Sequence, residues 1–386
     1  MEVRKLNEND YDQLLSLLNE VFTVHSGRQA DFLNLLPKMW IRDDLHMGYH
    51  IGVFEDERLV STVGCYPLEV VVGDTSLLFA TTGNVATLKE YEGRGYFSLL
   101  FDKVMDELQA MGVDAARLGG ERQRYGKYGY EPAGTVYDVK FTAKNRIKYY
   151  GDVGGDITFT EIFRDDCELL RFCDRVACGS DMYVRRSSDE GYRDVYLALC
   201  SKFCRPFVAM QGGKPIGYLS STIGESCTVY EMRYLSIEHF IPMLCAWQRR
   251  IGGNVILRLS PLMREELRLV TPGAEEITAL SPSRFKVIRP EKLADPLMRL
   301  KSQQLPMAKG ERIIGIEGYG NIRLYYDGKN AGCEMTDLPP DITVSRANST
   351  GLLFGNLPIW AYCSEIDPLI ESWLPLPFSW NALDVV

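Results

Sequence analysis

The feature that most constrains the fold is an apolar strand that runs through a glycine-rich turn into a helix. We expect the strand over residues 83–88, the turn over 92–95 and the helix over 96–111. Glycines without a β-carbon, here Gly93 and Gly95, let main-chain amides approach phosphate oxygens, and the helix N-terminus adds partial positive charge. Arg94 offers a planar cation to the same phosphates. The pattern predicts a diphosphate site, the alternative being an ordinary tight turn with a solvated arginine.

The residues around this turn exclude two common nucleotide-binding folds. Helical periodicity covers residues 9–22 and 32–39, and the strand patterns that follow, 49–54, 59–66, 68–72 and 76–80, are joined by tight turns in the manner of hairpins. No Gly-Lys-Ser/Thr follows the turn, so it is not a P-loop, and an antiparallel unit before it is a poor Rossmann site. We therefore predict an α+β fold with mixed, mostly antiparallel sheets flanked by helices.

A similar order of elements begins again near residue 156. It comprises a strand at 157–162, a helix at 165–176, a hairpin at 205–221, a helix ending near 250 and a strand at 254–259. No glycine-rich turn precedes the later helix, so this copy is expected to lack a cofactor. From about residue 285 the pattern changes to a helix at 290–300, strands at 313–317, 322–326 and 341–344, and a helix at 345–354. We expect three domains, at 1–148, 149–283 and 284–386.

Composition narrows the functional classes. A chain of 386 residues with a formal charge of −9 has no excess of Lys and Arg, which argues against nucleic acid as the main partner. No signal peptide pattern and no run of 18 apolar residues occur, so no membrane contact is expected. Ten cysteines without a C-x-x-C pair, with four histidines, predict no metal site and reduced thiols in the cytoplasm.

At the turn, the segment Glu92-Gly-Arg-Gly95-Tyr96-Phe97 resembles the cofactor signature Q/R-x-x-G-x-G/A of the GNAT acetyltransferases. Gly95 matches that signature, whereas Glu92 and Phe97 depart from it. Segments 85–96 and 125–132, with the chain length and the degenerate second copy, are similar to the enhanced intracellular survival (Eis) type within that family. The resemblance implies tandem GNAT-like domains followed by a C-terminal sterol-carrier-protein-like α/β domain.

The resemblance also implies the reaction and its residues. It points to an acetyl-CoA-dependent N-acetyltransferase without a metal, acting on a small-molecule or peptide amine, and to a homo-oligomer like the hexamers of relatives. Tyr125 corresponds to the general acid, and the terminal carboxylate of Val386 to the general base. The remaining correspondences place the pantetheine arm on Val85, Ala86 and Thr87, the diphosphate on Gly93, Arg94, Gly95, Tyr96, Phe97 and Ser98, and the cofactor further along on Gly120 and Glu121.

The chemistry of amide formation supports such a set of groups. An amine with a pKa near ~10 must lose a proton before attack, and a thiolate with a pKa near ~8.5 leaves more easily beside a hydroxyl acid. A strand amide near Val85 is a suitable donor to the carbonyl oxygen. If the terminal carboxylate does not reach, Glu121 or a water chain could serve as the base. Tyr128 and Tyr130, which flank glycines, are expected to be packing residues.

The acceptor pocket and the acceptor itself stay open at this point. Phe32, Met39 and Trp40 are candidate walls below the first two helices, with plain core as the alternative for each. A lysine side chain, a polyamine-like metabolite and an aminoglycoside-type antibiotic are all compatible amines. The rival hypotheses are a non-catalytic protein that binds CoA and a small apolar ligand, and an acyltransferase that takes longer acyl chains.

Overall fold

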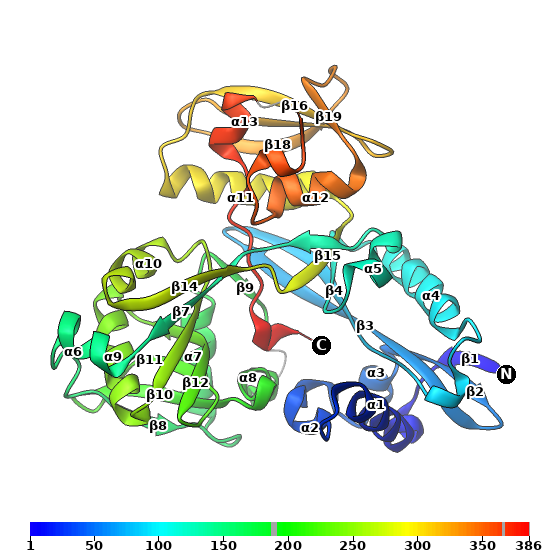
Figure 1. Ribbon diagram of the computed structural model, residues 1–386, viewed down its shortest axis with the longest axis horizontal. Coiled ribbons are helices and arrows are strands. Elements are labelled where there is room, and N and C mark those ends of the chain that lie inside the picture. The colour runs from blue at the N-terminus through cyan, green and yellow to red at the C-terminus, as the bar shows by residue number, and fades with distance from the viewer. Residues whose placement is uncertain (187–190, 365–366, 386) are drawn as a thin grey trace.

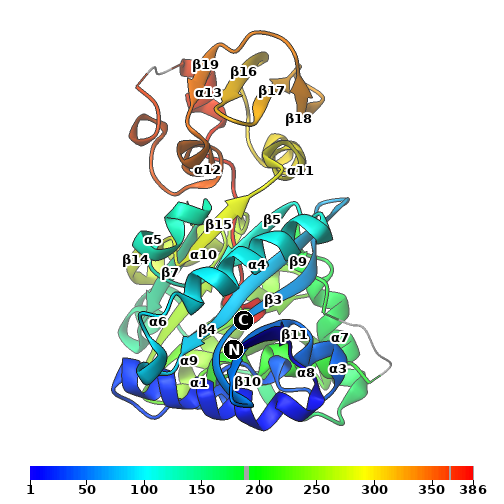
Figure 2. The same ribbon diagram turned by 90° about the vertical axis from the view of Figure 1, so that its right-hand side faces the viewer.

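The computed structural model describes residues 1–186, 191–364 and 367–385. Three lobes form the molecule, two side by side below and one above (Figures 1 and 2). The last described residues lie between the two lower lobes, in the centre of the view in Figure 1. None of the helices in these ranges has the length and hydrophobicity needed to span a bilayer.

The first lobe is built on a sheet with the order β1-β2-β3-β4-β5-β15-β6, with β9 paired to β3. Its helices α1 and α4 lie on either side of β3 and β4 (Figure 1). The strands are β1 (Glu2–Lys5), β2 (His50–Glu55), β3 (Arg58–Val72), β4 (Thr75–Thr87), β5 (Ala115–Leu118), β6 (Glu131–Ala133), β9 (Met182–Val184) and β15 (Ser283–Val287). The helices are α1 (Tyr11–Ser26), α2 (Phe32–Leu35), α3 (Asp44–Met47), α4 (Tyr96–Met111) and α5 (Arg122–Tyr125).

Two long strands replace the shorter ones that the sequence predicts, so the breaks predicted at residues 67 and 81–82 are wrong. β3 and β4 pair from Ser61 opposite Thr87 to Val72 opposite Thr75, with one register shift between Thr62 and Gly64. Thr81 and Thr82, which lie between two predicted strands, are both buried within β4, and the Thr82 hydroxyl lies 3.0 Å from the Tyr130 hydroxyl. The helix predicted at 96–111 is confirmed, with glycines in left-handed conformation at both ends.

The second lobe has a sheet with the order β14-β7-β13-β12-β11-β10-β8. Its strands β12 and β13 are parallel, as β4 and β5 are in the first lobe, and α9 connects them as α4 connects those. The bounds are β7 (Val136–Phe141), β8 (Thr158–Glu161), β10 (Arg205–Gln211), β11 (Lys214–Ser221), β12 (Ser226–Tyr234), β13 (Asn254–Leu259) and β14 (Ala274–Leu280). The helices are α6 (Ala143–Tyr150), α7 (Cys167–Ala177), α8 (Arg193–Leu199), α9 (Phe240–Ile251) and α10 (Arg264–Val270).

The two lower lobes exchange strands. β7 follows directly after the first sheet in sequence but pairs with β13 and β14 of the second. β15 follows the second sheet in sequence but pairs with β5 and β6 of the first, and β9 pairs antiparallel with β3. The exchange crosses both predicted boundaries, 148/149 and 283/284, so each sheet contains strands from outside its predicted domain.

The upper lobe packs a sheet of order β18-β17-β16-β19 on α11, which contacts β17 and β18. Helices predicted at 290–300 and 345–354 and strands predicted at 313–317, 322–326 and 341–344 are confirmed within a few residues. The bounds are β16 (Gly310–Ile316), β17 (Gly320–Tyr326), β18 (Ala331–Thr336), β19 (Ile342–Val344), α11 (Pro290–Gln304), α12 (Arg346–Phe354) and α13 (Pro368–Trp373).

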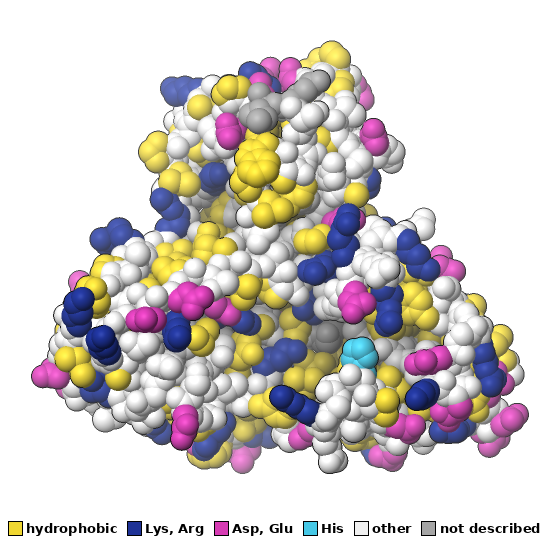
Figure 3. All heavy atoms as spheres, in the orientation of Figure 1, with side chains coloured by type: hydrophobic (Ala, Val, Ile, Leu, Met, Phe, Trp, Pro, Cys, Tyr) yellow, Lys and Arg dark blue, Asp and Glu magenta, His cyan; other side chains and the backbone are white. Residues whose placement is uncertain are grey.

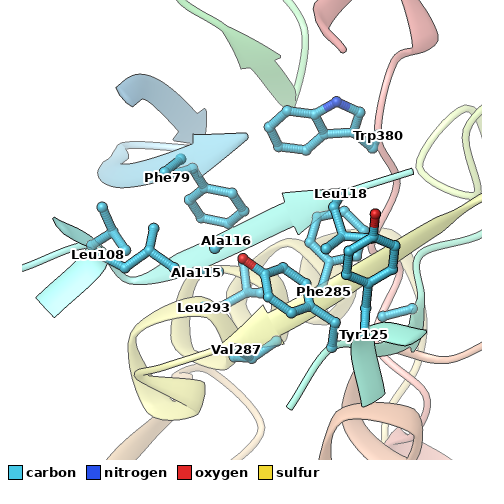
Figure 4. Close-up of a cluster of buried hydrophobic side chains, with 14 of the residues drawn as sticks. Phe79, Leu108, Ala115, Ala116, Leu118, Tyr125, Phe285, Val287, Leu293 and Trp380 are labelled. Atoms are coloured by element: carbon cyan, nitrogen blue, oxygen red, sulfur yellow. The ribbon is translucent and has the colours of Figure 1, made fainter. Parts of the chain in front are cut away.

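The C-terminal segment returns from the upper lobe to the junction of the lower two. The Trp380 ring stacks on Phe79 of β4 at 5.6 Å, and Phe285 of β15 lies 5.8 Å from the same ring (Figure 4). Buried Asp384 then accepts hydrogen bonds from Arg186 at 2.8 and 2.9 Å. Arg186 also binds Glu231 of β12 through two hydrogen bonds. The segment is therefore held by an aromatic stack and a buried ion cluster.

We expect Asp384→Asn to lower the free energy of unfolding by about 1.5–3 kcal/mol, because it removes a charged acceptor from a buried arginine that keeps only Glu231. Thermal unfolding of the purified chain measures the effect. The exposed Asp337→Asn serves as the control and should leave the midpoint unchanged. Equal midpoints for the two variants would contradict the anchoring role of Asp384.

Candidate active site

The site begins where two parallel strands separate. β4 and β5 pair only over Phe79–Thr82 and Ala115–Leu118. Beyond these residues β4 continues to Thr87, while β5 ends and the chain turns through Gly119 and Gly120 into α5. The main chains diverge, so a cavity opens between the end of β4 and the start of α5. Groups that β4 would use to bind a neighbouring strand become available to a ligand.

A β-bulge lies at the point of divergence. Thr62 pairs with Ala86 and Gly64 pairs with Gly83, so Asn84 and Val85 of β4 oppose one residue of β3. Asn84 adopts a left-handed conformation with φ 52°, which asparagine tolerates better than most residues. The bulge twists β4 and takes Val85 out of the regular ladder. The bulge lies in the strand segment for which the sequence predicts a carbonyl-binding amide.

Buried polar side chains hold this bulge. Asn84 Nδ2 donates to the Tyr66 hydroxyl at 2.8 Å, and that hydroxyl is hydrogen-bonded to His50 Nε2. His50 Nδ1 lies 3.3 Å from the Met47 carbonyl, which can only accept, so Nε2 is the acceptor for Tyr66. Burial lowers the pKa of His50 to about 4, which keeps the imidazole neutral at pH 7. Sequence reasoning missed these residues; Gly83-Asn84 inside a strand pattern is the signal that could have indicated a bulge.

The glycine-rich turn forms the next wall of the cavity. Gly93 and Gly95 have φ values of 76° and 83°, which other residues adopt at a cost. Gly95 is the N-cap of α4, and a β-carbon at either glycine would meet no atom within 4 Å. The unpaired amides of the first turn of α4 therefore border open space. This is the arrangement that the diphosphate prediction requires.

Tyr125 closes the other side of the cavity at the end of α5. It is 5% exposed, and desolvation by burial raises the pKa of its phenol, so it is protonated at neutral pH. Phe97 meets the Tyr125 ring edge-on at 5.8 Å, and Phe101 lies 5.3 Å from it. Figure 4 shows Tyr125 beside Leu118 in the buried cluster. Phe97, which departs from the cofactor signature, is thus the residue that packs against Tyr125.

These elements line one continuous, half-open cavity of about 950 Å³. Most of the predicted site residues line it. They are Val85, Ala86, Thr87, Gly93, Gly95, Tyr96, Phe97, Ser98, Gly120, Glu121, Tyr125 and Phe32. Further lining comes from α1 and α2, through Glu20, Val21, Phe22, Val24, His25, Leu35 and Leu36, and from Lys89, Arg124 and Lys202.

Three predicted residues are placed differently. Arg94 does not line the cavity; its guanidinium lies over the Tyr91 ring at 4.6 Å and donates to the Glu90 carbonyl at 3.3 Å. Trp40 donates from Nε1 to the Phe32 carbonyl at 2.8 Å and packs beside Tyr11, as a core residue would. Met39 is buried in the same core.

Val386 lies outside the described residues, so its predicted role as base stays a prediction. The chain before it is fixed: Leu383 and Val385 are buried, and Lys38 donates to the Leu383 carbonyl at 3.2 Å. The 3₁₀ turn at 382–384 contacts the turn at 201–203, whose Lys202 lines the cavity. Across the described ranges, no three His, Cys, Asp or Glu side chains group so as to hold a metal.

Comparisons with known proteins agree with this geometry. Residues 2–133 match the family model of the acetyltransferase (GNAT) domain. Eis1 from Mycobacterium abscessus is similar with a TM-score of 0.66 and 14% identity, each chain being covered to 99%. A GCN5-related N-acetyltransferase from Kribbella flavida gives 0.65 and 17%, with both chains covered completely. The corresponding protein from Anabaena variabilis gives 0.67 and 12%, with 98% of each chain covered.

At these identities the solved structures show the shared fold over the whole chain, which confirms the α+β class with GNAT-like domains in tandem. No curated protein sequence matches the chain. The family match covers the lobe that contains the divergent strands, the glycine-rich turn and Tyr125. Over residues 2–133 the chain therefore matches the acetyltransferase (GNAT) domain, and this match supports an N-acetyltransferase.

Proposed function

We propose that the protein transfers the acetyl group of acetyl-CoA directly to a primary amine within a ternary complex. The amine nitrogen attacks the thioester carbonyl, the carbon–sulfur bond breaks, and the CoA sulfur takes a proton. The observation that carries this proposal is the single cavity of about 950 Å³ that Val85, Gly95 and Tyr125 all line. A donor and an acceptor can meet there without an intermediate carrier.

The cavity lining favours direct transfer over an acyl-enzyme. Among the described residues that line it there is no cysteine, and Ser98 lies in the first turn of α4, where the diphosphate is proposed to bind. A covalent route needs an activated nucleophile beside the thioester. Val85, Ala86 and Thr87 instead present strand main chain, to which a pantetheine amide can bind as an added strand.

Tyr125 is proposed as the general acid. Its raised pKa keeps the phenol protonated, and its ring is fixed by Phe97 and Phe101. The thiolate of CoA is a better base than water near neutral pH, so a proton from a fixed hydroxyl assists its departure. The terminal carboxylate of Val386 is proposed as the base, supported by the anchoring of residues 383–385 beside the cavity.

Several broader assignments belong to the same proposal. The upper lobe, a sheet covered by helices, is proposed to be a sterol-carrier-protein-like domain that closes the molecule over β15 and the C-terminal segment. A cytoplasmic homo-oligomer is proposed from the resemblance to the Eis type. The acceptor is a small-molecule or peptide amine, and lysine, polyamine-like and aminoglycoside-type amines are the classes to compare.

Tyr125→Phe tests the acid. The variant keeps the ring and its packing but loses the hydroxyl, so kcat should fall by about 10²-fold while the Kd for CoA changes little. Release of free thiol from acetyl-CoA with a panel of amines measures kcat, and calorimetry measures CoA binding.

Tyr128→Phe is the matched control, because Tyr128 packs on Phe101 at 4.5 Å in the same loop but does not line the cavity. It should retain the wild-type rate. Equal rates for wild type and Tyr125→Phe would remove the acid role from Tyr125. CoA binding without transfer to any amine would favour the non-catalytic binding protein.

Gly95→Ala tests the diphosphate turn. The methyl group meets no protein atom, so the fold should lose only about 1 kcal/mol from the left-handed conformation. The same methyl group occupies space where a phosphate would approach the amides, and we expect the Kd for CoA to rise about tenfold, equivalent to roughly 1.4 kcal/mol.

Gly112→Ala provides the same backbone change at the opposite end of α4. Gly112 has φ 64° and equally open surroundings, but it does not line the cavity. The thermal midpoint of Gly112→Ala should fall by about as much as that of Gly95→Ala, whereas its affinity for CoA should stay at the wild-type value. If both variants bind CoA equally well, the turn at 92–95 does not hold the diphosphate.

A further inference from the structure

One cationic side chain in the cavity comes from the second lobe. Lys202 lies in the 3₁₀ turn at 201–203, which contacts α2 of the first lobe and the C-terminal turn at 382–384. Lys89 and Arg124, the other cations of the lining, lie next to the glycine-rich turn and Tyr125, on the cofactor side. Lys202 is on the acceptor side, among residues of α1 and α2.

The backbone at this turn is strained. Lys202 and Phe203 both adopt left-handed conformations, with φ values of 61° and 60°, although neither is glycine or asparagine. Each such residue costs of order 1 kcal/mol and persists only where its surroundings fix it. Here the Ser201 hydroxyl donates to the Leu197 carbonyl at 3.2 Å, and the Cys204 amide donates to the Ser201 carbonyl at 3.2 Å. The strained turn presents Lys202 to the cavity.

Within the described part of the chain, no carboxylate lies within 4.0 Å of the Lys202 ammonium, and no hydrogen bond satisfies it. Burial and the charge of Arg117 lower the pKa of Lys202 to about 8, so the ammonium is still mostly protonated at pH 7. A half-buried cation without a counter-ion among these residues carries a desolvation cost, which a bound anionic ligand would offset.

Nearby cations add to the positive potential. Buried Arg117 of β5 donates to Ser283 and lies close to Gly119, which lines the cavity. Buried Lys38 interacts repulsively with both Lys202 and Arg117 and is offset by the charge of Asp384. Figure 3 shows Lys and Arg side chains gathered in the hollow between the two lower lobes. The acceptor side of the cavity therefore has a positive electrostatic potential near Lys202.

The 201–203 turn contacts α2, and the α1 and α2 walls of the cavity include the apolar residues Phe22, Phe32, Leu35 and Leu36. An ion pair formed against apolar walls is less screened than one in water. Glu20 and His25 lie at the α1 wall of the same cavity. The geometry suits an elongated acceptor with an apolar middle and a negative group at the end away from its reacting amine.

We propose that the acceptor is an amine that also bears a carboxylate or another anionic group, and that Lys202 from the second lobe binds this group. The proposal rests on the acetyl transfer proposed above and names its acceptor class. Lys202 then acts in specificity: it binds the substrate but takes no part in proton transfer. It also gives the second lobe a direct share in the site of the first.

Matched acceptors test the proposal. 5-Aminopentanoate and 5-aminopentanamide have the same length and the same reacting amine, and differ in the negative charge. With the wild-type protein and acetyl-CoA, kcat/KM for the acid should exceed that for the amide by about tenfold or more, chiefly through KM. Equal values for the two acceptors would overturn the proposal.

Variants then assign the preference to Lys202. Lys202→Gln should bring the acid-to-amide ratio close to one while leaving kcat/KM for the amide within about threefold of wild type. Lys202→Arg should keep most of the preference. Lys214→Gln, in the exposed β10–β11 turn, is the control and should change neither value. If Lys202→Gln slows both acceptors equally, the lysine serves the reaction or the fold, and the proposal is wrong.

A binding measurement separates this proposal from the transfer reaction. Calorimetric titration of the CoA-loaded protein with pentanoate and with pentanamide needs no catalysis. Pentanoate should bind at least tenfold more tightly than pentanamide to wild type, and equally weakly to Lys202→Gln. If this difference appears without turnover of any amine, the anion site stands and the proposed transferase activity fails. If turnover occurs and pentanoate shows no advantage, the anion site fails alone.

Discussion

The separation of β4 from β5 is the constraint on which the rest of the site depends. Parallel pairing brings the two strands together over Phe79–Thr82 and Ala115–Leu118 and then ends. The bulge at Asn84 and Val85 increases the twist of β4 at that point, and hydrogen bonds from Asn84 through Tyr66 to His50 hold it. Without the bulge we expect the end of β4 to pair with a neighbouring strand. Its main-chain amides and carbonyls would then form hydrogen bonds within the sheet and would not be available to a ligand.

The same divergence determines how the glycine-rich turn and Tyr125 are arranged. β4 leads into the turn and α4, while β5 leads into α5, so the two chain segments that leave the sheet become opposite walls of one cavity. Phe97 contacts both walls, since it lies in the first turn of α4 and packs on Tyr125 of α5. A small residue at position 97 would leave the Tyr125 ring without that contact. Phe97, which replaces the small residue of the family signature, thus has a packing role beside Tyr125.

Much of this could be predicted from the sequence, because the signals were local. The turn at 92–95 and the helix behind it follow from glycine spacing and helical periodicity, whereas Tyr125 was indicated by the resemblance to the GNAT family. The partners of Arg94 and the location of Trp40 could not be predicted from the sequence. Arginine at a glycine-rich turn has several partners within reach, and only the fold shows that Arg94 stacks on Tyr91. An apolar ring at helical spacing fits a pocket wall or a core equally well, and Trp40 lies in the core.

The strand exchange could not be predicted, because it depends on pairing between segments far apart in the chain. β7, β14 and β15 are short strands of six, seven and five residues, whose local sequence does not specify a partner. Register, not composition, decides that Phe285 of β15 faces the cluster with Phe79 and Trp380. For the same reason the sequence does not indicate Lys202 as a cavity residue. It reaches the cavity because its turn contacts α2, which lies about 170 positions earlier in the chain.

The second lobe contributes to the site of the first lobe although it has no glycine-rich turn of its own. The 3₁₀ turn before α9 has no glycine, so the second lobe has no equivalent of the diphosphate wall. Its β12 instead supplies Glu231 to the cluster that holds Arg186 and Asp384, and the turn after α8 supplies Lys202 to the cavity. Burial alone would raise the pKa of Glu231, but the charge and hydrogen bonds of Arg186 lower it to about 2, so the cluster stays charged over the physiological range. The second lobe thus fixes the C-terminal segment and lines part of the first lobe's cavity.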